Sequence, residues 1–547
     1  MKADPNEVAK FQGIQRFVLL MLENRSFDHL FGYLNAVNPK VMGLTGNESN
    51  QKNPNSPTDP AIKVSRASSF VMTFDPSHEF YDVQVQLYGP LTDTDPSLPP
   101  IANLPRYPAP MTGFLASATQ AVDYSGDENL VMECFQPDQM PVLSTLATEF
   151  ALFNFWYSSL PGPTWPNRFF IHAATSGGLT DSPSTGQILA GFSFQSDTIF
   201  ERLDDAGKDW CIYHDGLPQM AGITSLRDEF IDPFTEKFQD MDDFFEDIKN
   251  ADLADYNFIE PRYDTGNNYL DGNSMHPLND IRKGEELVKR VYEALRNSEY
   301  WKDTMLIITF DEHGGFYDHL SPPGTVPTGD DSNYANLAYS FRFDCLGVRV
   351  PAIVVSAYTG KGTIIGADAG DPATVFDHSS VLATVEKRFG LAPLTERDRA
   401  ANSLEVAINL AAPRLLPTEA LTKLPVPDAN AAAHPVVPAR LVFRVGTDAG
   451  LPDPVFAHHR VRLPRLRQIQ RVVDVVIAEL QSDGAFGLRV AEGMKHRVAR
   501  LQAGHPAFVR LLELVTAHGI VEEVGEVREQ VEIVVVAVSH QLRGARV

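Results

Sequence analysis

Short, unbroken runs of apolar residues recur along the first 360 residues, and stretches with helical spacing separate them. The runs are RFVLLML (16–22), ALFNFWYSS (151–159), DTMLIITF (303–310) and VRVPAIVVSAY (348–358). Such runs are typical of strands buried on both faces of a parallel sheet. The expected helices are 26–34, 140–150, 164–177, 281–298 and 379–390. Alternating strands and helices predict an α/β sandwich with a central, mostly parallel sheet and helices on both faces.

Polar residues interrupt the apolar pattern where three of these strands end. Glu23 and Asn24 follow the first strand, Asp311 and Glu312 follow the third, and Thr164 opens the helix that comes after the second. In α/β sheets, ligands bind beyond the carboxyl ends of the strands. All five side chains offer oxygen, which favours a hard divalent cation, Ca²⁺, Mg²⁺ or Mn²⁺, with Zn²⁺ as an alternative. The pattern therefore indicates a cation site at this edge of the sheet.

Each of these residues also has an ordinary structural interpretation. Glu23 and Asn24 could be turn or capping residues, and the two acids after the third strand could simply solvate its end. Thr164 could be only the N-cap of its helix, with Pro166 in the first turn. In the functional interpretation, an adjacent ion activates the Thr164 hydroxyl as a nucleophile, and the free N–H groups of the helix N-terminus suit a phosphate.

Histidines gather in polar, loop-like segments of the same region. A single loop histidine is usually exposed, but several near a phosphate site could bind phosphoryl oxygens or protonate a leaving group. The candidates are His78, His276, His313, His319 and His378. By contrast, His172 in RFFIHAATS is expected to pack within a helix, and Asp318 and His319 could serve only to shape their loop.

Composition divides the chain into parts. Residues 35–110 are rich in Asn, Pro, Ser and Asp and predict a long irregular excursion. Beyond the main domain, 466–480 and 508–519 have helical spacing, and 531–538 could be helix or strand. The predicted organisation is a catalytic domain (1–410), an Ala/Pro-rich linker (411–438) and a small, mainly helical C-terminal module of unknown role (439–547).

Charge and cysteine content narrow the function classes. The chain has 547 residues and a formal net charge of −25, which argues against nucleic-acid binding. Residues 439–547 hold 15 Lys and Arg against 12 Asp and Glu, so this module could bind a partner protein or make peripheral contact with an anionic membrane. A packing module with solvated arginines is an equal alternative. The three cysteines include no CxxC pair, so no disulfide framework is expected.

The beginning of the sequence shows no apolar signal-peptide region, and no apolar run reaches the length of about 18 residues that a membrane helix needs. We therefore expect either a cytoplasmic protein or export by a signal-independent route.

Four motifs carry a resemblance to a known family. They are ENRSFDHLFGYL (23–34), TWPNRFFIHAATSGG (164–178), FDEHGGFYDHLSPP (310–323) and FDHSSVLATVEKRFGL (376–391). Together, and in this order, they resemble the phosphoesterase family of the alkaline phosphatase superfamily. That family includes non-specific phospholipases C and some acid phosphatases. The resemblance runs from about Arg16 to Leu391 and implies the fold of that superfamily.

The resemblance also implies roles for single residues. Glu23 and Asn24 match the family's first metal-binding pair, Asp311 and Glu312 match the second, and Thr164 matches the nucleophile that also contacts the metal. The implied catalytic residues are Thr164, His78, His276 and His378. The implied substrate-binding residues are Asn24, His78, His276, His313 and Arg168.

The implied function is metal-dependent hydrolysis of a phosphoester through a phospho-threonine intermediate. We expect a phospholipase C that releases diacylglycerol and a phosphorylated head group. An acid phosphatase acting on small phosphomonoesters is the first alternative. A catalytically idle binding protein or delivered effector that acts through its C-terminal module is the second.

Overall fold

The computed structural model divides the chain into two compact units, residues 1–183 with 192–431, and residues 184–191 with 432–547. The structure describes residues 11, 13–53, 56, 58–66, 68–89, 108–122, 124, 126–232, 235–330, 339, 341–366, 374–415 and 419–427, together with strands at 439–446, 497–501 and 532–539.

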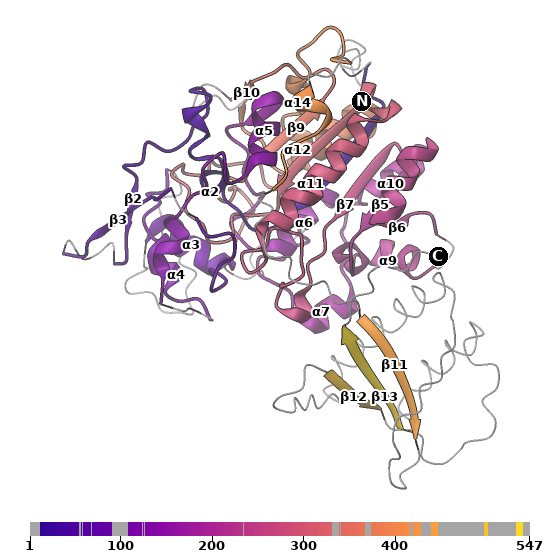
Figure 1. Ribbon diagram of the computed structural model, residues 1–547, viewed down its shortest axis with the longest axis horizontal. Helices are drawn as coiled ribbons and strands as arrows, with labels where there is room; N and C mark the ends of the chain where they lie inside the picture. Colours follow the sequence, from indigo (N-terminus) through magenta and orange to yellow (C-terminus); the bar gives the residue numbers. More distant parts are fainter. Residues whose placement is uncertain are drawn as a thin grey trace. The chain divides into compact units, whose positions relative to one another are not determined.

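A large sheet forms the centre of the first unit (Figure 1). Across it, the eight described strands are β10 (Thr363–Ile365), β4 (Ala151–Phe153), β9 (Ala352–Ser356), β8 (Thr304–Phe310), β1 (Arg16–Leu22), β7 (Tyr256–Glu260), β5 (Trp210–His214) and β6 (Phe238–Asp240). β9 is antiparallel to β4 and β8, and the other described neighbours are parallel. The predicted mostly parallel sheet is confirmed.

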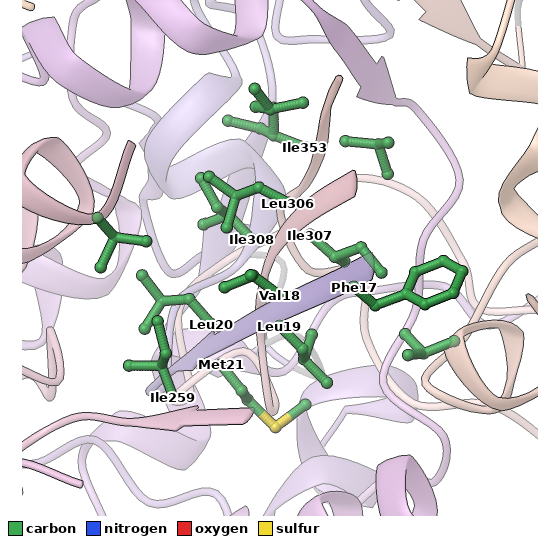
Figure 2. Close-up of a cluster of buried hydrophobic side chains, with 14 of the residues drawn as sticks. Phe17, Val18, Leu19, Leu20, Met21, Ile259, Leu306, Ile307, Ile308 and Ile353 are labelled. Carbon is green, nitrogen blue, oxygen red and sulfur yellow. The ribbon is translucent and has the colours of Figure 1, made fainter. Parts of the chain in front are cut away.

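β1 lies in the middle of this sheet and is buried on both faces. Residues 17–22 have no solvent exposure, and their side chains pack among those of β7, β8 and β9, as Figure 2 shows. The register pairs Leu20 of β1 with Ile259 of β7 and Ile308 of β8, and Leu22 with Phe310. The carboxyl ends of β1 and β8 are therefore level with each other.

Helices cover both faces of the sheet. Alternate residues of β5 point to opposite faces, and Trp210 meets Phe200 of α8, whereas Tyr213 meets Phe244 of α10. On the α8 side, mutual contacts link α6 (Thr164–Ala173), α8 (Ile199–Asp205), α12 (Ser379–Phe389) and α13 (Glu396–Ala400). On the α10 side, contacts link α5 (Pro141–Glu149), α10 (Met241–Asn250), α11 (Ile281–Arg296) and α14 (Glu419–Thr422). α10 and α11 lie side by side in Figure 1.

Element boundaries differ from the predictions where the chain leaves regular structure for tertiary contacts. β4 stops at Phe153, and the side chain of the next residue, Asn154, bonds to the backbone of Met42 and Lys40. The short helix α2 (Phe27–Phe31) ends earlier than expected. α6 ends at Ala173, with Ala174 as its C-cap in the left-handed conformation, rather than at Gly177 or Gly178.

The excursion after α2 is less irregular than the composition predicts. Its described part contains β2 (Ser49–Gln51), β3 (Ala61–Lys63) and α3 (Phe80–Tyr88), which gather with α4 (Phe114–Ala118) in Figure 1. These elements enclose a second hydrophobic cluster that includes Phe74, Val83 and Phe114. Phe316, from the loop after β8, also packs there, so the excursion is anchored beside the carboxyl end of the sheet. A short helix, α9 (Thr224–Ile231), follows β5.

The C-terminal region is only partly described. Leu421 and Leu424, in the predicted linker, are buried in the core of the first unit, and the Tyr292 hydroxyl donates to the carbonyl of Leu421. In the second unit, α7 is Thr185–Ala190, and β11 (Ala439–Gly446), β13 (Glu532–Ser539) and β12 (Arg497–Leu501) form an antiparallel sheet in that order. Residues 532–538 of the ambiguous segment thus lie in strand β13, whereas the predicted helices at 466–480 and 508–519 lie outside the described residues. Within the described residues, none of the helices has the length and apolar character to cross a membrane.

Candidate active site

Two pairs of polar residues meet where β1 and β8 end. The backbone N–H of Asn24 donates to Oδ1 of Asp311 at 3.0 Å, and the N–H of Arg25 donates to the carbonyl of Glu312 at 3.0 Å. Glu23, on the other side, donates its N–H to the carbonyl of Ser274. The level strand ends therefore place side chains together that are almost 290 positions apart in the sequence.

Unusual backbone conformations allow this close approach. Asn24 has a φ of +58°, a region that Asn tolerates better than most residues. Gly314 has a φ of +63°, and a Cβ at this position would lie 2.2 Å from the carbonyl oxygen of Asn24. Glycine is therefore required at position 314 both by conformation and by space.

Thr164 joins the two pairs from a third element. Its hydroxyl donates to Oδ1 of Asn24 at 3.2 Å. The N-cap of α6 is Pro163, and Thr164 is the first helical residue and makes no capping bond. The interpretation of Thr164 as only an N-cap is therefore wrong, whereas Pro166 does lie in the first turn as expected.

The carboxylates at this edge are buried, and this changes their acidity. Burial, together with the neighbouring Asp311 carboxylate, raises the pKa of Glu23 to about 7 and that of Glu312 to about 8. Oδ2 of Asp311 accepts from Nε of the fully buried Arg168 at 3.1 Å, and Oε1 of Glu312 lies 3.8 Å from Nε2 of His78. Burying three acids together is unfavourable unless a positive charge compensates them.

The donor set fits a divalent cation. Oε2 of Glu23 and Oε1 of Glu312 are buried and have no hydrogen-bond partner within the described part of the chain. An unpartnered buried carboxylate oxygen is costly, and a hard cation would satisfy both. The amide oxygen of Asn24 and the hydroxyl of Thr164 add two neutral oxygen donors beside them.

A different cluster is geometrically tighter but is already neutralised. Among the described residues, the ligand atoms of Asp28, Asp318 and His319 are the three that lie within 4.8 Å of one another. The buried guanidinium of Arg349 binds Oδ1 of Asp28 at 2.8 Å and Oδ2 of Asp318 at 3.1 Å. Because this guanidinium occupies the place of a cation, we interpret the cluster as an ion-pair network that joins α2 to the loop after β8. Asp318 and His319 shape that loop, as expected.

His78 reaches the site from the excursion. Its Nε2 lies 3.3 Å from Nδ2 of Asn24 and 3.8 Å from Oε1 of Glu312, while Nδ1 contacts the carbonyl of Pro76 at 2.7 Å. Burial acts to lower the pKa of His78, but the carboxylates of Glu312 and Asp75 outweigh it and raise that pKa to about 10. Because an amide nitrogen only donates, Nε2 of His78 accepts from Asn24 here, and the raised pKa makes this nitrogen a ready proton acceptor.

His276 and His78 both interact with the carboxylate of Asp75. Its Nε2 is 3.4 Å from Oδ2 of Asp75, and its Nδ1 accepts from the N–H of Leu278 at 3.3 Å. Burial acts to raise the pKa of Asp75, but His276 outweighs it and holds that pKa below its usual value. Sequence reasoning missed Asp75, although it lies in the same TFDPSHEF segment as His78, three positions before it.

The remaining predicted residues lie behind the acids. His313 is buried between Oε1 of Gln86, at 2.6 Å, and Oε2 of Glu312, and burial lowers its pKa well below the usual value. His378 is fully buried and donates from Nε2 to the carbonyl of Asp311 at 2.7 Å. His172 is packed against Phe200 and Phe258, as predicted.

The sequence model of the Phosphoesterase family matches residues 14–392. The chain belongs to the phosphoesterase family. Relatives include "Non-specific phospholipase C3" of Arabidopsis thaliana, 36% identical over 420 residues, which cover 75% of this chain and 76% of that protein. "Non-specific phospholipase C6" of the same plant is 40% identical over 73% of each chain. This phosphoesterase is also 29% identical to "Hemolytic phospholipase C" of Pseudomonas aeruginosa, over 70% of this chain and 53% of that protein.

The family expected from the four motifs is thus confirmed, and the chain is a phosphoric ester hydrolase. Among solved structures, the phosphoesterase is similar to the phosphonate monoester hydrolase of Agrobacterium radiobacter, at 12% identity and a TM-score of 0.29, over 57% of this chain and 76% of that one. A likeness at this level supports no conclusion about the site.

Proposed function

We propose that this phosphoesterase is a metal-dependent phospholipase C with Thr164 as its nucleophile. The observation that carries the proposal is the 3.2 Å hydrogen bond from the Thr164 hydroxyl to Asn24, whose own N–H binds Asp311. A hydroxyl that begins a helix, beside several buried acids, is the arrangement that nucleophilic attack on phosphorus needs. The relatives named as non-specific phospholipases C support a phospholipid as substrate.

Five residues would hold the cation: Glu23, Asn24, Thr164, Asp311 and Glu312. When bound, a divalent ion would lower the pKa of an adjacent hydroxyl and offset the negative charge of a phosphoryl group. The unpartnered oxygens of Glu23 and Glu312 support this assignment, and the oxygen-only donor set favours Ca²⁺, Mg²⁺ or Mn²⁺.

The residues of the chain would then carry two steps. In the first, Oγ1 of Thr164 forms a bond to phosphorus while the bond from phosphorus to the diacylglycerol oxygen breaks. That oxygen takes up the proton that the Thr164 hydroxyl gives up, and His78, beside Asn24, is placed to carry it. In the second step, water cleaves the phospho-threonine and releases the phosphorylated head group. The N–H groups at the start of α6 would bind phosphoryl oxygens, and His276, whose nitrogens are engaged by Asp75 and Leu278, would line the phosphate site.

Three of the sequence-predicted residues would act by positioning. Arg168 and His378 both hold Asp311, the first at its carboxylate and the second at its carbonyl. His313 contacts Oε2 of Glu312, whereas His78 lies near Oε1 of the same carboxylate. All three are buried, so we assign them to the support of the acids rather than to contact with substrate.

Product analysis tests this function and separates it from its alternatives. Purified protein is incubated with phosphatidylcholine and, separately, with soluble phosphomonoesters. Release of diacylglycerol and phosphocholine supports a phospholipase C. Inorganic phosphate from the monoesters without lipid turnover would make the protein an acid phosphatase, and turnover of neither would favour a binding protein.

Metal dependence needs its own measurement. Elemental analysis of the purified protein is expected to find a bound divalent ion, and chelation is expected to remove activity that one of Ca²⁺, Mg²⁺, Mn²⁺ or Zn²⁺ restores. A metal-free protein with full activity would contradict the cation site while leaving the assignment of Thr164 open to its own test.

A further inference from the structure

A compact loop closes one side of the site. After β7 the chain runs from Arg262 to Asn273 and returns on itself, because the N–H of Arg262 donates to Oδ1 of Asn273 at 2.7 Å and the N–H of Asn273 donates to the carbonyl of Arg262 at 2.9 Å. Within it, the N–H groups of Asn267 and Tyr269 both donate to the carbonyl of Asp264. Nζ of Lys283, in α11, donates to the carbonyl of Leu270 at 2.8 Å and so connects the loop to this helix.

The loop 262–273 holds Tyr269 in an unfavourable backbone conformation. Asp264, Asn268 and Tyr269 have φ values of +57°, +52° and +62°. Asp and Asn tolerate this left-handed region, but for a bulky residue such as Tyr it is a genuine outlier. Strain of this kind persists only where the surrounding contacts determine it, and it concentrates at functional sites.

The contact that offsets the strain is a stack on His276. The two rings are almost parallel, with centroids 3.5 Å apart and 5° between the planes. His276 has both nitrogens engaged, Nε2 toward Asp75 and Nδ1 with the N–H of Leu278. The ring of Tyr269 covers one face of the imidazole, in the direction perpendicular to these bonds. Burial raises the pKa of the Tyr269 hydroxyl, and the carboxylates of Glu23, Asp75 and Asp311 add to this rise.

We propose that Tyr269 is a positioning residue, which fixes the plane of His276 by stacking on it and thereby holds His276 in register with Asp75 at the phosphoester site. The proposal deepens the proposed function and rests on it for its kinetic consequences. The residue acts through its aromatic face rather than through its hydroxyl.

Kinetics with a soluble phosphoester in the full-length protein separate the face from the hydroxyl. Tyr269→Phe keeps the stack and is expected to stay close to wild type. Tyr269→Leu removes the ring and is expected to lower kcat/KM about 10- to 100-fold, the usual effect of a small misplacement of a reacting group. Leu270→Ala, which alters an exposed neighbour in the same loop, is the control and is expected to change nothing. Equal losses in the Phe and Leu variants would overturn the proposal and point to the hydroxyl.

A double-mutant cycle shows whether Tyr269 acts through His276. If it does, Tyr269→Leu has little further effect in a His276→Ala background, because the group that it positions is gone. Multiplicative losses in the double variant would mean that the two residues act independently, which would overturn the proposal.

A spectroscopic measurement keeps the result independent of turnover. In the long-range ¹H–¹⁵N spectrum of ring-labelled histidines, we expect wild-type His276 as a single tautomer protonated at Nε2, and tautomer averaging in Tyr269→Leu with an unchanged thermal midpoint. Unaltered His276 signals in that variant would overturn the positioning role. Absence of turnover in the wild type would instead overturn the proposed function, and the spectrum would still decide the role of Tyr269.

Discussion

Thr164 is half-buried at the start of α6, and its hydroxyl donates to Asn24. Removal of this hydroxyl is therefore expected to affect turnover much more than stability. Thr164→Ala takes away one hydrogen bond, for which we expect a loss of about 1 kcal/mol in the free energy of unfolding. The same change removes the proposed nucleophile, and we expect turnover to fall by at least about 10³-fold. Product release and thermal unfolding of the same preparation measure the two effects.

Thr164→Ser is the matched control for this prediction, because it keeps the hydroxyl at the same position. It is expected to retain a large part of the activity and to form a phosphorylated residue at position 164 that mass spectrometry detects after a rapid quench. Normal turnover in Thr164→Ala would remove Thr164 from the mechanism.

Gly314 tests whether the close approach of the two strand ends matters for the chemistry. A Cβ at Gly314 would lie 2.2 Å from the carbonyl oxygen of Asn24, so Gly314→Ala must displace Asn24 from Thr164 and Asp311. Gly207 has almost the same φ, +64°, but open space around it. We expect both Ala variants to lose about 1–2 kcal/mol of stability through the left-handed backbone.

Only Gly314→Ala is expected to lose activity as well, by about 100-fold, because a shift of Asn24 moves a ligand and the partner of Thr164 together. Denaturant unfolding and steady-state kinetics of the two variants supply the comparison. Equal activity in both would show that the position of Asn24 is not critical.

At the scale of elements, the apolar pattern of the sequence predicted the positions of the strands well. It did not predict the surroundings of the polar side chains. The apolar run 16–22 coincides with β1. A strand that is buried on both faces is apolar at every position, so its own sequence is enough to recognise it. The burial of His313 and His378 could not be inferred, since it depends on Gln86 of α3 and Trp156 after β4, which are distant in sequence. The four motifs pointed to Thr164 and Asn24 as site residues, but they did not predict the hydrogen bond between them.

The same limit applies to Asp318, which shares one motif with Asp311. The two acids have the same residue type and similar surroundings in the sequence, yet Asp311 faces Asn24 and Arg168, whereas Asp318 is paired with Arg349. Which arginine approaches which acid is decided by long-range packing, and the local pattern contains no signal for it.

Helix α6 carries a testable dependence of stability on pH. His172 is buried between Phe200 and Phe258, and burial, with the charge of Arg168, holds its pKa well below the usual 6.5. Below pH 6.5 the unfolded chain therefore binds a proton at this residue that the folded chain does not. The contribution of His172 to stability is complete above about pH 6.5 and is lost as the pH falls, with a slope of at most about 1.4 kcal/mol per pH unit.

His172→Phe keeps an aromatic ring in the same place and removes the titration. We expect the fall in the free energy of unfolding between pH 7 and pH 5 to be less steep in this variant than in the wild type. Urea unfolding at pH 5, 6 and 7 measures both slopes. Parallel slopes would mean that His172 is protonated equally in the two states, and hence that it is less buried than the structure shows.

At the scale of the whole molecule, the catalytic machinery and the basic surplus are separate along the chain. All proposed site residues lie between Glu23 and His378, within the first unit. Residues 439–547 hold 15 Lys and Arg against 12 Asp and Glu, whereas the complete chain has a net charge of −25. The remainder of the chain is thus strongly acidic and would be repelled by an anionic lipid surface, so the C-terminal region is the part suited to meet one.

A chain ending at Ala431 separates these contributions. Because all proposed site residues lie in the first unit, we expect its kcat and KM on a soluble phosphomonoester or short-chain ester to equal those of the full chain. On vesicles that contain anionic lipid at low salt, we expect the shortened chain to bind and hydrolyse less, while neutral phosphatidylcholine vesicles show no difference. Residues 184–191, which cluster with the second unit, remain in this chain, so a thermal unfolding curve must accompany the kinetics. Loss of activity on the soluble ester with an unchanged unfolding midpoint would mean that the second unit contributes to the site itself.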